Sequence, residues 1–471
     1  MPLILPGNVA SATASTTYDV ANSCRFNAAD SAYMQWTPTD SAGTDGQIYT
    51  LSFWLKRGLF AARTVLSYAT PQSQIQFESD VWNAHGFKDG GTTWYETKTT
   101  AKYSDPSAWY HFVTAVDTTQ GTEANRVKVY VNGVQITSFA DVGYPTEDQN
   151  TLFFTDIVHA IGRYEYGDSS YFDGYLAEFI GIDGTQYAAS DFGEFDSDSP
   201  TIWKPKDISG LTFGNAGFYL SYSDSADLGA DSSGNSNDFT VNNLDATDQA
   251  IDTPTNNFAV MNPLDNFYAA ATITEGNCKI SSDRYGFNTS TFALTKGKWY
   301  AEFKIVSFTG ASVGITSVPA DATNDEFGGN GGTGPGFALY HEGGVYGNVG
   351  VLVASGGYDS FSNNDIIGCA LDLTNNRLYF ANNGTWQGSS DPTDGTNALS
   401  ITAPASTRDG HYFFAIASET GNTAVWEVNF GGCPAFTVSS GNADADGYGN
   451  FEYAPPSGYY ALCTKNLAEY G

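Results

Sequence analysis

Apolar and polar residues alternate over short stretches along much of the chain, and turn residues separate these stretches. In YTLSFWLK, residues 49–56, the side chains of Leu51, Phe53 and Leu55 can face one side while the residues between them face the other. Residues 126–136, RVKVYVNGVQI, repeat the pattern with alternating valines and then an Asn-Gly pair. A two-residue period is typical of half-buried β-strands, so both segments are predicted to be strands.

A second hairpin pattern occurs in DIIGCALDLTNNRLYFANNGTW, residues 365–386. The apolar run 366–373 meets the turn Thr-Asn-Asn, and the run 377–381 meets Asn-Asn-Gly. Asn and Gly tolerate the positive φ that tight turns need. No long segment has strong helical periodicity, so the pattern favours an all-β protein.

Composition supports the all-β fold class and suggests more than one domain. Of the 471 residues, 15% are aromatic and 51 are Gly, a combination typical of strands joined by many turns. A chain of this length exceeds one ordinary domain, so two or three are expected. No two of its five cysteines have the CxxC spacing, which argues against a zinc site.

The net charge of −32, from 52 acidic and 20 basic residues, narrows the choice of partners. Such a surface repels nucleic-acid phosphates and anionic membranes, so we expect no nucleic-acid partner. No segment reaches the roughly 18 apolar residues of a membrane span, and MPLILPGNVASATAST lacks the basic start of a signal peptide. We therefore expect synthesis in the cytoplasm and no membrane insertion.

Five pieces in the first half of the chain occur in a familiar order. They are SCRFNAADSAYM, YTLSFWLKRG, WYHFVTAVD, VKVYVNGVQI and FDGYLAEFIGIDG. Together they resemble the laminin-G-like or pentraxin-like branch of the concanavalin-A-like jelly roll. The resemblance implies a β-sandwich over residues 21–184.

A second set of pieces resembles a SPRY domain: GKWYAEF, VGIT, IIGCALDLTNNRLYFANNGTW and VNFG. This resemblance implies a second β-sandwich, over residues 267–435, that binds a partner through loops at one end. The chain is thus expected to hold two concanavalin-A-like sandwiches in tandem. Three segments surround them: an N-terminal arm (1–20), a partly folded connection (185–266) and a C-terminal extension (436–471).

A search for catalytic groups gives no catalytic residue. Glycoside hydrolases of this fold use two nearby carboxylates, often as ExDxxE on one strand, and no such string occurs. Glu178 and Asp183 are the nearest pair, but their odd separation places them on opposite faces of a regular strand. His111, inside WYHFVTAVD, is interpreted as a packing residue. The sequence therefore predicts a protein that is not an enzyme.

Two acidic loops raise the question of calcium. DSADLGADSSGNSND offers oxygen ligands at Asp224, Asp227, Asp231, Asn235 and Asp238, and calcium prefers six to eight oxygens. Asx turns explain the same loop equally well. The loop NADADGYGNFEY, residues 442–453, begins like a calcium loop but has Tyr where the twelfth-position Glu belongs.

Aromatic residues near the predicted loops are candidates for stacking on sugar rings. They are Trp82 and Trp94 in the first block, and Tyr358 and Trp386 in the second. The alternative for each of them is ordinary core packing.

The chain as a whole resembles virion-associated appendage proteins of tailed bacteriophages. The pieces that carry this resemblance are NVASATAST with NSCRFN, SGNSNDFTVNNLDATDQ with TPTNNF after it, and PPSGYYALCTKNL. It implies a virion surface location, contacts with other virion proteins and a homotrimer.

Three functions are weighed from these residues. The first is a tail or head fibre that binds host cell-surface glycan, with the N-terminal arm docking on the particle or joining subunits. The second is a capsid decoration or baseplate protein that uses the same folds for protein contacts. The third is a polysaccharide depolymerase, which the lack of paired carboxylates on one strand disfavours.

Overall fold

The structure is a computed structural model of the chain. It describes residues 4, 18–39, 46–61, 63–68, 73–87, 93–265, 271–282, 286–319, 336–347, 351–354, 356–419 and 421–471. Strands make up 44% of the structure and the described residues contain one α-helix, so the predicted all-β class is confirmed. None of the described helices is long and apolar enough to span a membrane.

The chain forms two compact units. The N-terminal unit comprises residues 13–255, and the C-terminal unit comprises residues 256–471 together with residues 1–12. Short 3-10 helices lie in the loops of both units: η2 (Ala28–Asp30), η3 (Glu123–Asn125), η4 (Ala189–Asp191), η5 (Ala246–Asp248), η6 (Gln387–Ser389) and η7 (Pro404–Ser406).

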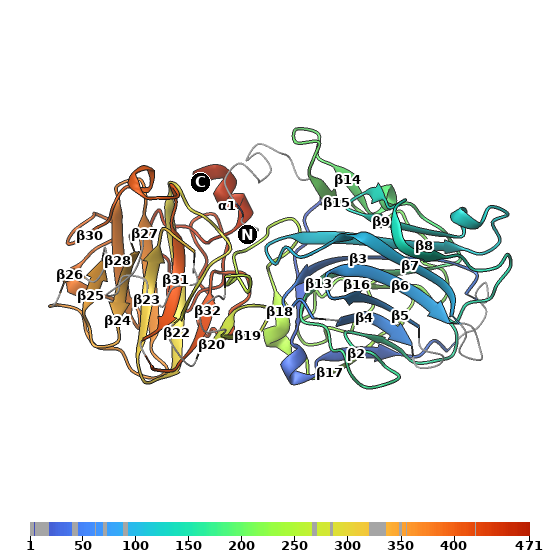
Figure 1. The fold of residues 1–471 in the computed structure, drawn as a ribbon, viewed down its shortest axis with the longest axis horizontal. Helices are drawn as coiled ribbons and strands as arrows, with labels where there is room; N and C mark the ends of the chain where they lie inside the picture. Colours follow the sequence, from blue (N-terminus) through green and yellow to red (C-terminus); the bar gives the residue numbers. More distant parts are fainter. Residues whose placement is uncertain are drawn as a thin grey trace. The chain divides into compact units, whose positions relative to one another are not determined.

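The N-terminal unit contains two eight-stranded antiparallel sheets (Figure 1). The first sheet is built from β1 (Ser23–Phe26), β3 (Ile48–Arg57), β8 (Trp109–Asp117), β9 (Val127–Val131), β10 (Val134–Gln135), β13 (Gly174–Asp183), β16 (Phe218–Leu220) and β18 (Gln249–Ala250). Its order is β10-β9-β8-β3-β13-β1-β18, and β16 pairs with β13.

The second sheet of this unit has the order β11-β7-β6-β5-β4-β12-β2-β17. Its strands are β2 (Tyr33–Trp36), β4 (Arg63–Tyr68), β5 (Ser73–Glu78), β6 (Val81–Phe87), β7 (Thr93–Lys102), β11 (Phe139–Gly143), β12 (His159–Ile161) and β17 (Thr240–Asn242). The inward side chains of the two sheets form one core, in which Phe53 stacks on Phe179 with ring centroids 4.6 Å apart.

Residues 185–255 extend this sandwich. Strands β16 and β18 pair with the first sheet and β17 pairs with the second. The hairpin of β14 (Gly193–Phe195) and β15 (Trp203–Pro205) belongs to a smaller apolar cluster that includes Val113, Ile180 and Phe192. The connection that the sequence left unassigned is therefore part of the N-terminal fold up to residue 255.

His111 lies within that smaller cluster and packs as the sequence predicts. Its ring stacks on Trp54 with centroids 4.6 Å apart, and its Nδ1 accepts the indole N–H of Trp203 at 3.0 Å. Nδ1 accepts, so the ring proton of neutral His111 is on Nε2, which donates to Ser52 Oγ at 2.8 Å. Burial lowers the pKa of His111 to about 3, which keeps the ring neutral.

The C-terminal unit is a second sandwich (Figure 1). Its larger sheet contains β19 (Thr272–Thr274), β20 (Lys279–Ser282), β22 (Lys298–Phe308), β27 (Ile366–Asp372), β28 (Arg377–Asn382), β29 (Thr385–Trp386), β30 (Leu399–Ser400) and β32 (Ala424–Asn429). The other sheet contains β21 (Gly286–Thr289), β23 (Ala311–Thr316), β24 (Gly336–Tyr340), β25 (Val345–Gly347), β26 (Val351–Ala354) and β31 (Phe413–Ser418), in the order β21-β31-β23-β24-β25-β26.

Both predicted hairpins are confirmed. Strand β27 pairs with β28, with Cys369 opposite Phe380, and β8 pairs with β9 before the turn to β10. The turn residues have the positive φ that their chemistry predicts: φ is 47° at Asn132 and 56° at Asn376.

The C-terminal residues cover the larger sheet of their own unit. Tyr460 bridges to Trp299, and α1 (Thr464–Tyr470) places Leu467 in the core. At the other end of the chain, Ile4 pairs with Phe292 of this unit. Of the predicted N-terminal arm, only Ile4 and residues 18–20 are described.

Glu302 fastens the C-terminal segment to β22. Its Oε1 accepts the N–H of Tyr453 at 2.7 Å and the hydroxyl of Tyr300 at 3.2 Å. Its Oε2 accepts the N–H of Glu452 at 3.0 Å and the amide of Asn429 at 3.1 Å. Burial raises the pKa of Glu302 to about 7, against the effect of these four donors.

We expect Glu302→Ala to destabilise the C-terminal unit by about 3 kcal/mol or more, because several buried donors lose their acceptor. Urea unfolding of the full chain, followed by tryptophan fluorescence, measures this. Glu342→Ala is the control: Glu342 is exposed, and its loss should change stability by less than about 0.5 kcal/mol. Equal effects of the two substitutions would contradict the role given to Glu302.

Candidate functional site

The outer side of the second sheet of the N-terminal unit carries a group of neighbouring polar side chains. On β5, β6 and β7 the inward residues Ile75, Phe77, Ala84 and Tyr95 belong to the core. The residues between them face outward. We call these side chains the polar face, and they are Gln74, Gln76, Glu78, Asn83, His85, Glu96 and Lys98. All are partly exposed except Asn83, which is fully buried.

Strand register aligns the polar face in rows that run across the strands. One row places Ser67, Gln74, His85 and Glu96 side by side on β4, β5, β6 and β7. The next row consists of Thr64, Gln76, Asn83 and Lys98. Directly opposite residues on one face have Cβ atoms about 5 Å apart, so the members of each row are close neighbours. Ser67, Thr64 and Asn83 are fully buried, so the accessible part of the rows lies on β5, β6 and β7.

A hydrogen-bond network orders the polar face. The side-chain amide of Asn83 donates to Glu78 Oε1 at 2.7 Å and to Glu96 Oε1 at 2.9 Å. Lys98 forms an ion pair with Glu78. Burial alone would raise the pKa of Glu78, but the hydrogen bonds from Lys98 and Asn83 lower it. Burial lowers the pKa of His85, although Glu96 and Glu78 lie nearby.

This chemistry suits binding better than bond cleavage. Ordered carboxylate groups can accept hydrogen bonds from hydroxyls, and ordered amide groups can both accept and donate them, so the face can hold several hydroxyls at once. Glycoside hydrolysis needs one carboxyl group that stays protonated through a raised pKa. Glu78 is held in its ionised form, so it does not supply that acid.

The sequence contains the alternation that creates the polar face, in QIQFE, WNAH and YETK. A motif such as ExDxxE places all of its acidic residues on one strand. The structure gathers two or three polar residues from each of three strands, and only the register reveals this.

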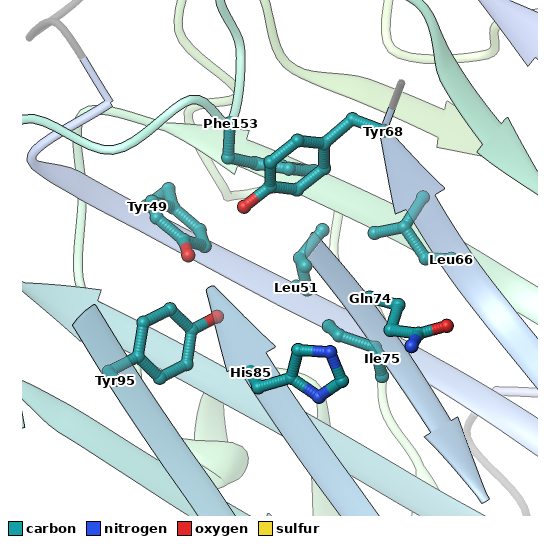
Figure 2. Close-up of a pocket in the computed structure, with 9 residues that line it drawn as sticks. All are labelled: Tyr49, Leu51, Leu66, Tyr68, Gln74, Ile75, His85, Tyr95 and Phe153. Carbon is teal, nitrogen blue, oxygen red and sulfur yellow. The ribbon is translucent and has the colours of Figure 1, made fainter. Parts of the chain in front are cut away.

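A small cavity adjoins the polar face between the two sheets (Figure 2). Its volume is about 10 Å³, room for about one water molecule. The hydroxyl groups of Tyr49, Tyr68 and Tyr95 point toward the same space in Figure 2. Burial raises the pKa of Tyr95 to about 12, so this phenol stays neutral. The cavity is too small for a sugar ring and is part of the core.

The aromatic candidates of the N-terminal unit do not form a platform. Trp82 is fully buried and stacks on Phe112 with ring centroids 4.2 Å apart, so the prediction that it stacks on a ligand is wrong. Trp94 lies in β7, but its side chain is outside the described part of the structure. In the sequence Trp82 lies near a Gly-rich stretch, but in the structure it lies inside β6.

The two candidates of the C-terminal unit lie close together, Tyr358 in a loop and Trp386 in β29. The side chain of Gln387 links the two segments: it accepts the N–H of Asp359 at 3.0 Å and donates to Thr385 O at 2.8 Å. Tyr358 lies against Gly388, where an added Cβ would be 3.4 Å from its ring. Trp386 is half-buried, with its ring edge toward Tyr300. Tyr358 and Trp386 are thus near neighbours, each with part of its surface open.

The first acidic loop folds as a set of turns. Asp231 accepts three backbone N–H groups, from Tyr219, Ser233 and Asn237, at 2.8 to 2.9 Å. Asp238 accepts the N–H of Asp231 in the same way. Asp224 accepts the N–H of Ala226, and Asp227 accepts the N–H of Gly229. The side-chain amide of Asn235 donates to the carbonyls of Gly214 and Gly217.

These contacts correspond to the Asx-turn alternative and not to a calcium cage. The carboxylates point at the backbone of their own loop, and the described residues contain no group of three or more acidic, His or Cys side chains suited to a metal. In the second loop, Asp444 is also engaged internally, by the N–H groups of Tyr448 and Ala461 and the amide of Asn466.

Strand β13 is irregular at Glu178, which corrects the expectation of a regular strand. Its register shifts between Ala177 and Ile180, and φ of Glu178 is 49°. The side chain accepts the hydroxyls of Tyr219 at 2.6 Å and Tyr18 at 2.8 Å. Burial raises its pKa. Glu178 is therefore an internal acceptor closed off from any polymeric substrate.

Each unit belongs to the class of antiparallel two-sheet β-sandwiches. Residues 28–180 match the Concanavalin A-like lectin/glucanases superfamily, and residues 298–432 match the SPRY domain. The chain therefore contains one domain of each kind, as the two resemblances implied. No curated protein matches the sequence.

Three solved structures match this chain at low similarity. The SPRY domain of human HERC1 is 14% identical with a TM-score of 0.28, and the match covers 38% of this chain and 99% of that one. A "putative carbohydrate binding protein" from Bacteroides ovatus is 12% identical with a TM-score of 0.30, over 48% and 60%. Stonustoxin is 15% identical with a TM-score of 0.23, over 36% and 26%. These similarities are too low to transfer a function.

We expect Asp231→Ala to destabilise the N-terminal unit by about 2 to 4 kcal/mol, because three backbone N–H groups lose their acceptor. Thermal unfolding with calcium and with a chelator measures this. The loss should be the same in both conditions, and Asp224→Ala, which removes one exposed turn bond, should have little effect. A calcium-dependent stability of the natural protein that Asp231→Ala abolishes would restore the metal alternative.

Proposed function

We propose that the protein is a non-enzymatic surface protein of a bacteriophage particle, a tail or head fibre, that binds host cell-surface glycan. Its other partners are virion proteins, and the assembled form is a homo-oligomer, a trimer by the resemblance stated above. The observation that carries the glycan-binding part is the polar face.

The polar face has the properties that a sugar needs. Its groups are ordered by the Asn83 network before any ligand arrives, so little entropy is lost on binding. Its partly exposed members lie on β5, β6 and β7, so the accessible surface spans three adjacent strands. Weak contacts of this kind are strengthened when several copies bind one surface.

The charge of the chain narrows the class of glycan. A net charge of −32 repels polyanions, and the polar face itself holds Glu78 and Glu96 against one lysine, Lys98. Neutral or amino-sugar polymers therefore suit it better than sulfated or uronic-acid polymers.

A decoration or baseplate protein is the second candidate. It would use the two sandwiches for contacts between virion proteins. The observation that favours it is the exposed apolar strand β26, in which Leu352 and its two neighbours face solvent.

The first experiment measures binding of labelled protein to host cells and to a panel of neutral, amino and acidic glycans. The double substitution Gln74→Ala with Gln76→Ala should weaken binding about tenfold, the cost of a lost hydrogen bond or two. Gln135→Ala is the matched control, because Gln135 is an exposed glutamine on β10 of the other sheet. Excess natural protein should also block adsorption of particles.

Two outcomes would contradict the proposal. Equal binding by the double variant and the control would remove the polar face as the site. Absence of binding by the natural oligomer to every host cell and glycan would remove the adhesin function and leave the decoration role.

We expect no release of reducing ends when the protein is incubated with host polysaccharide, because Glu78 is held ionised by Lys98 and Asn83. A reducing-end assay with a known depolymerase as positive control checks this. Turnover that Glu78→Gln or Glu96→Gln abolishes would show that the polar face is an active site.

A further inference from the structure

Strand β26 is an outermost strand with three successive exposed apolar side chains. Val351, Leu352 and Val353 are 57%, 46% and 44% exposed. The register between β25 and β26 shifts at Val353, which interrupts the two-residue alternation. This interruption explains how three neighbouring side chains all reach solvent.

The other outermost strands of the described sheets are protected. Most, such as β10, β17, β18, β19 and β29, have only two or three residues. Strand β21 is largely buried, and β11 carries Asp141 and a register shift. Short length, cover and charge are the usual means of preventing edge-to-edge pairing. Strand β26 lacks charge and cover, and its four residues make it longer than the short edges.

The sequence around β26 has no formal charge. Residues 343–358 include no Asp, Glu, Lys or Arg, in a chain whose net charge is −32. Two copies of so acidic a protein repel one another at most orientations. The repulsion is smallest where neither copy presents a carboxylate, so an uncharged edge is the place where copies can approach.

We propose that β26 is a self-association surface, where two copies of this chain meet antiparallel about a two-fold axis at Leu352. The sequence Val-Leu-Val reads the same in both directions. Antiparallel pairing centred on Leu352 therefore places Leu352 against Leu352 and Val351 against Val353. A two-fold interface must be self-complementary in this way. A partner of opposite charge would find no charged group here to recognise.

The contact is small, and this sets its strength. One short strand edge buries less than the roughly 1,600 Å² of a standard interface, so we expect a dissociation constant in the micromolar range or weaker. Salt should tighten the association, because it screens the repulsion between two acidic copies. The contact joins copies in pairs, and a particle that presents many copies would multiply it.

Sedimentation equilibrium from low micromolar to the highest soluble concentration tests the proposal. The weight-average mass of the natural protein should rise with concentration toward twice the mass of the smallest species present. The rise should be steeper at high salt. Leu352→Lys should abolish this rise. Val134→Lys, at an exposed valine of β10 that is 57% accessible, is the matched control and should leave it unchanged.

Cysteine substitutions test the register directly. All five natural cysteines are buried, so an introduced thiol is the accessible one. Leu352→Cys should form a disulfide-linked dimer under mild oxidation, because opposed residues of antiparallel strands have Cα atoms within bonding range. Val351→Cys and Val353→Cys should each crosslink poorly alone and efficiently when mixed. Val134→Cys should not crosslink.

Three results would overturn the proposal. They are a constant mass of the natural protein over the whole concentration range, a Leu352→Lys protein that associates like the natural one, and crosslinking of Val134→Cys as fast as that of Leu352→Cys. Unchanged circular dichroism and melting temperature show that a variant is folded.

Discussion

The aromatic packing inside the N-terminal sandwich fixes the register on which its outer surface depends. Trp82 stacks on Phe112, and Phe53 stacks on Phe179. A slip of one residue in β6 would turn Trp82 to solvent and bring Asn83 and His85 into the core. The burial of one large ring therefore decides which side chains stand on the polar face. Trp82 contributes to the candidate site by orienting its neighbours and makes no contact with a ligand.

The sequence predicted local features well, because they depend on neighbouring residues. The two hairpins needed only an Asn-Gly or Asn-Asn turn between alternating runs, and both formed. The polar face could not be predicted in the same way, because Gln76, Asn83 and Lys98 come together only through pairing of three strands. The irregularity at Glu178 has no sequence signal, since a Glu with φ of 49° is sterically unusual.

The carboxylates of this acidic chain show how environment decides the role of one chemical group. Glu78 is held ionised by Lys98 and Asn83 near the surface. Glu302 is buried with four donors, and its pKa rises to about 7. Asp231 closes a turn by accepting backbone N–H groups. In each case the oxygens satisfy donors of the protein itself. A count of acidic residues therefore overestimates both metal sites and catalytic pairs.

Net charge then acts on the assembly and not on the fold. Scattered carboxylates keep copies apart at most orientations, and this repulsion protects the many strand edges of two open sandwiches from random pairing. Residues 343–358 carry no formal charge, so this repulsion is weakest around them. Exposed apolar residues on a free strand edge are costly in solution unless something covers them. Under the pairing proposed for β26, the same repulsion directs two copies to this one uncharged edge.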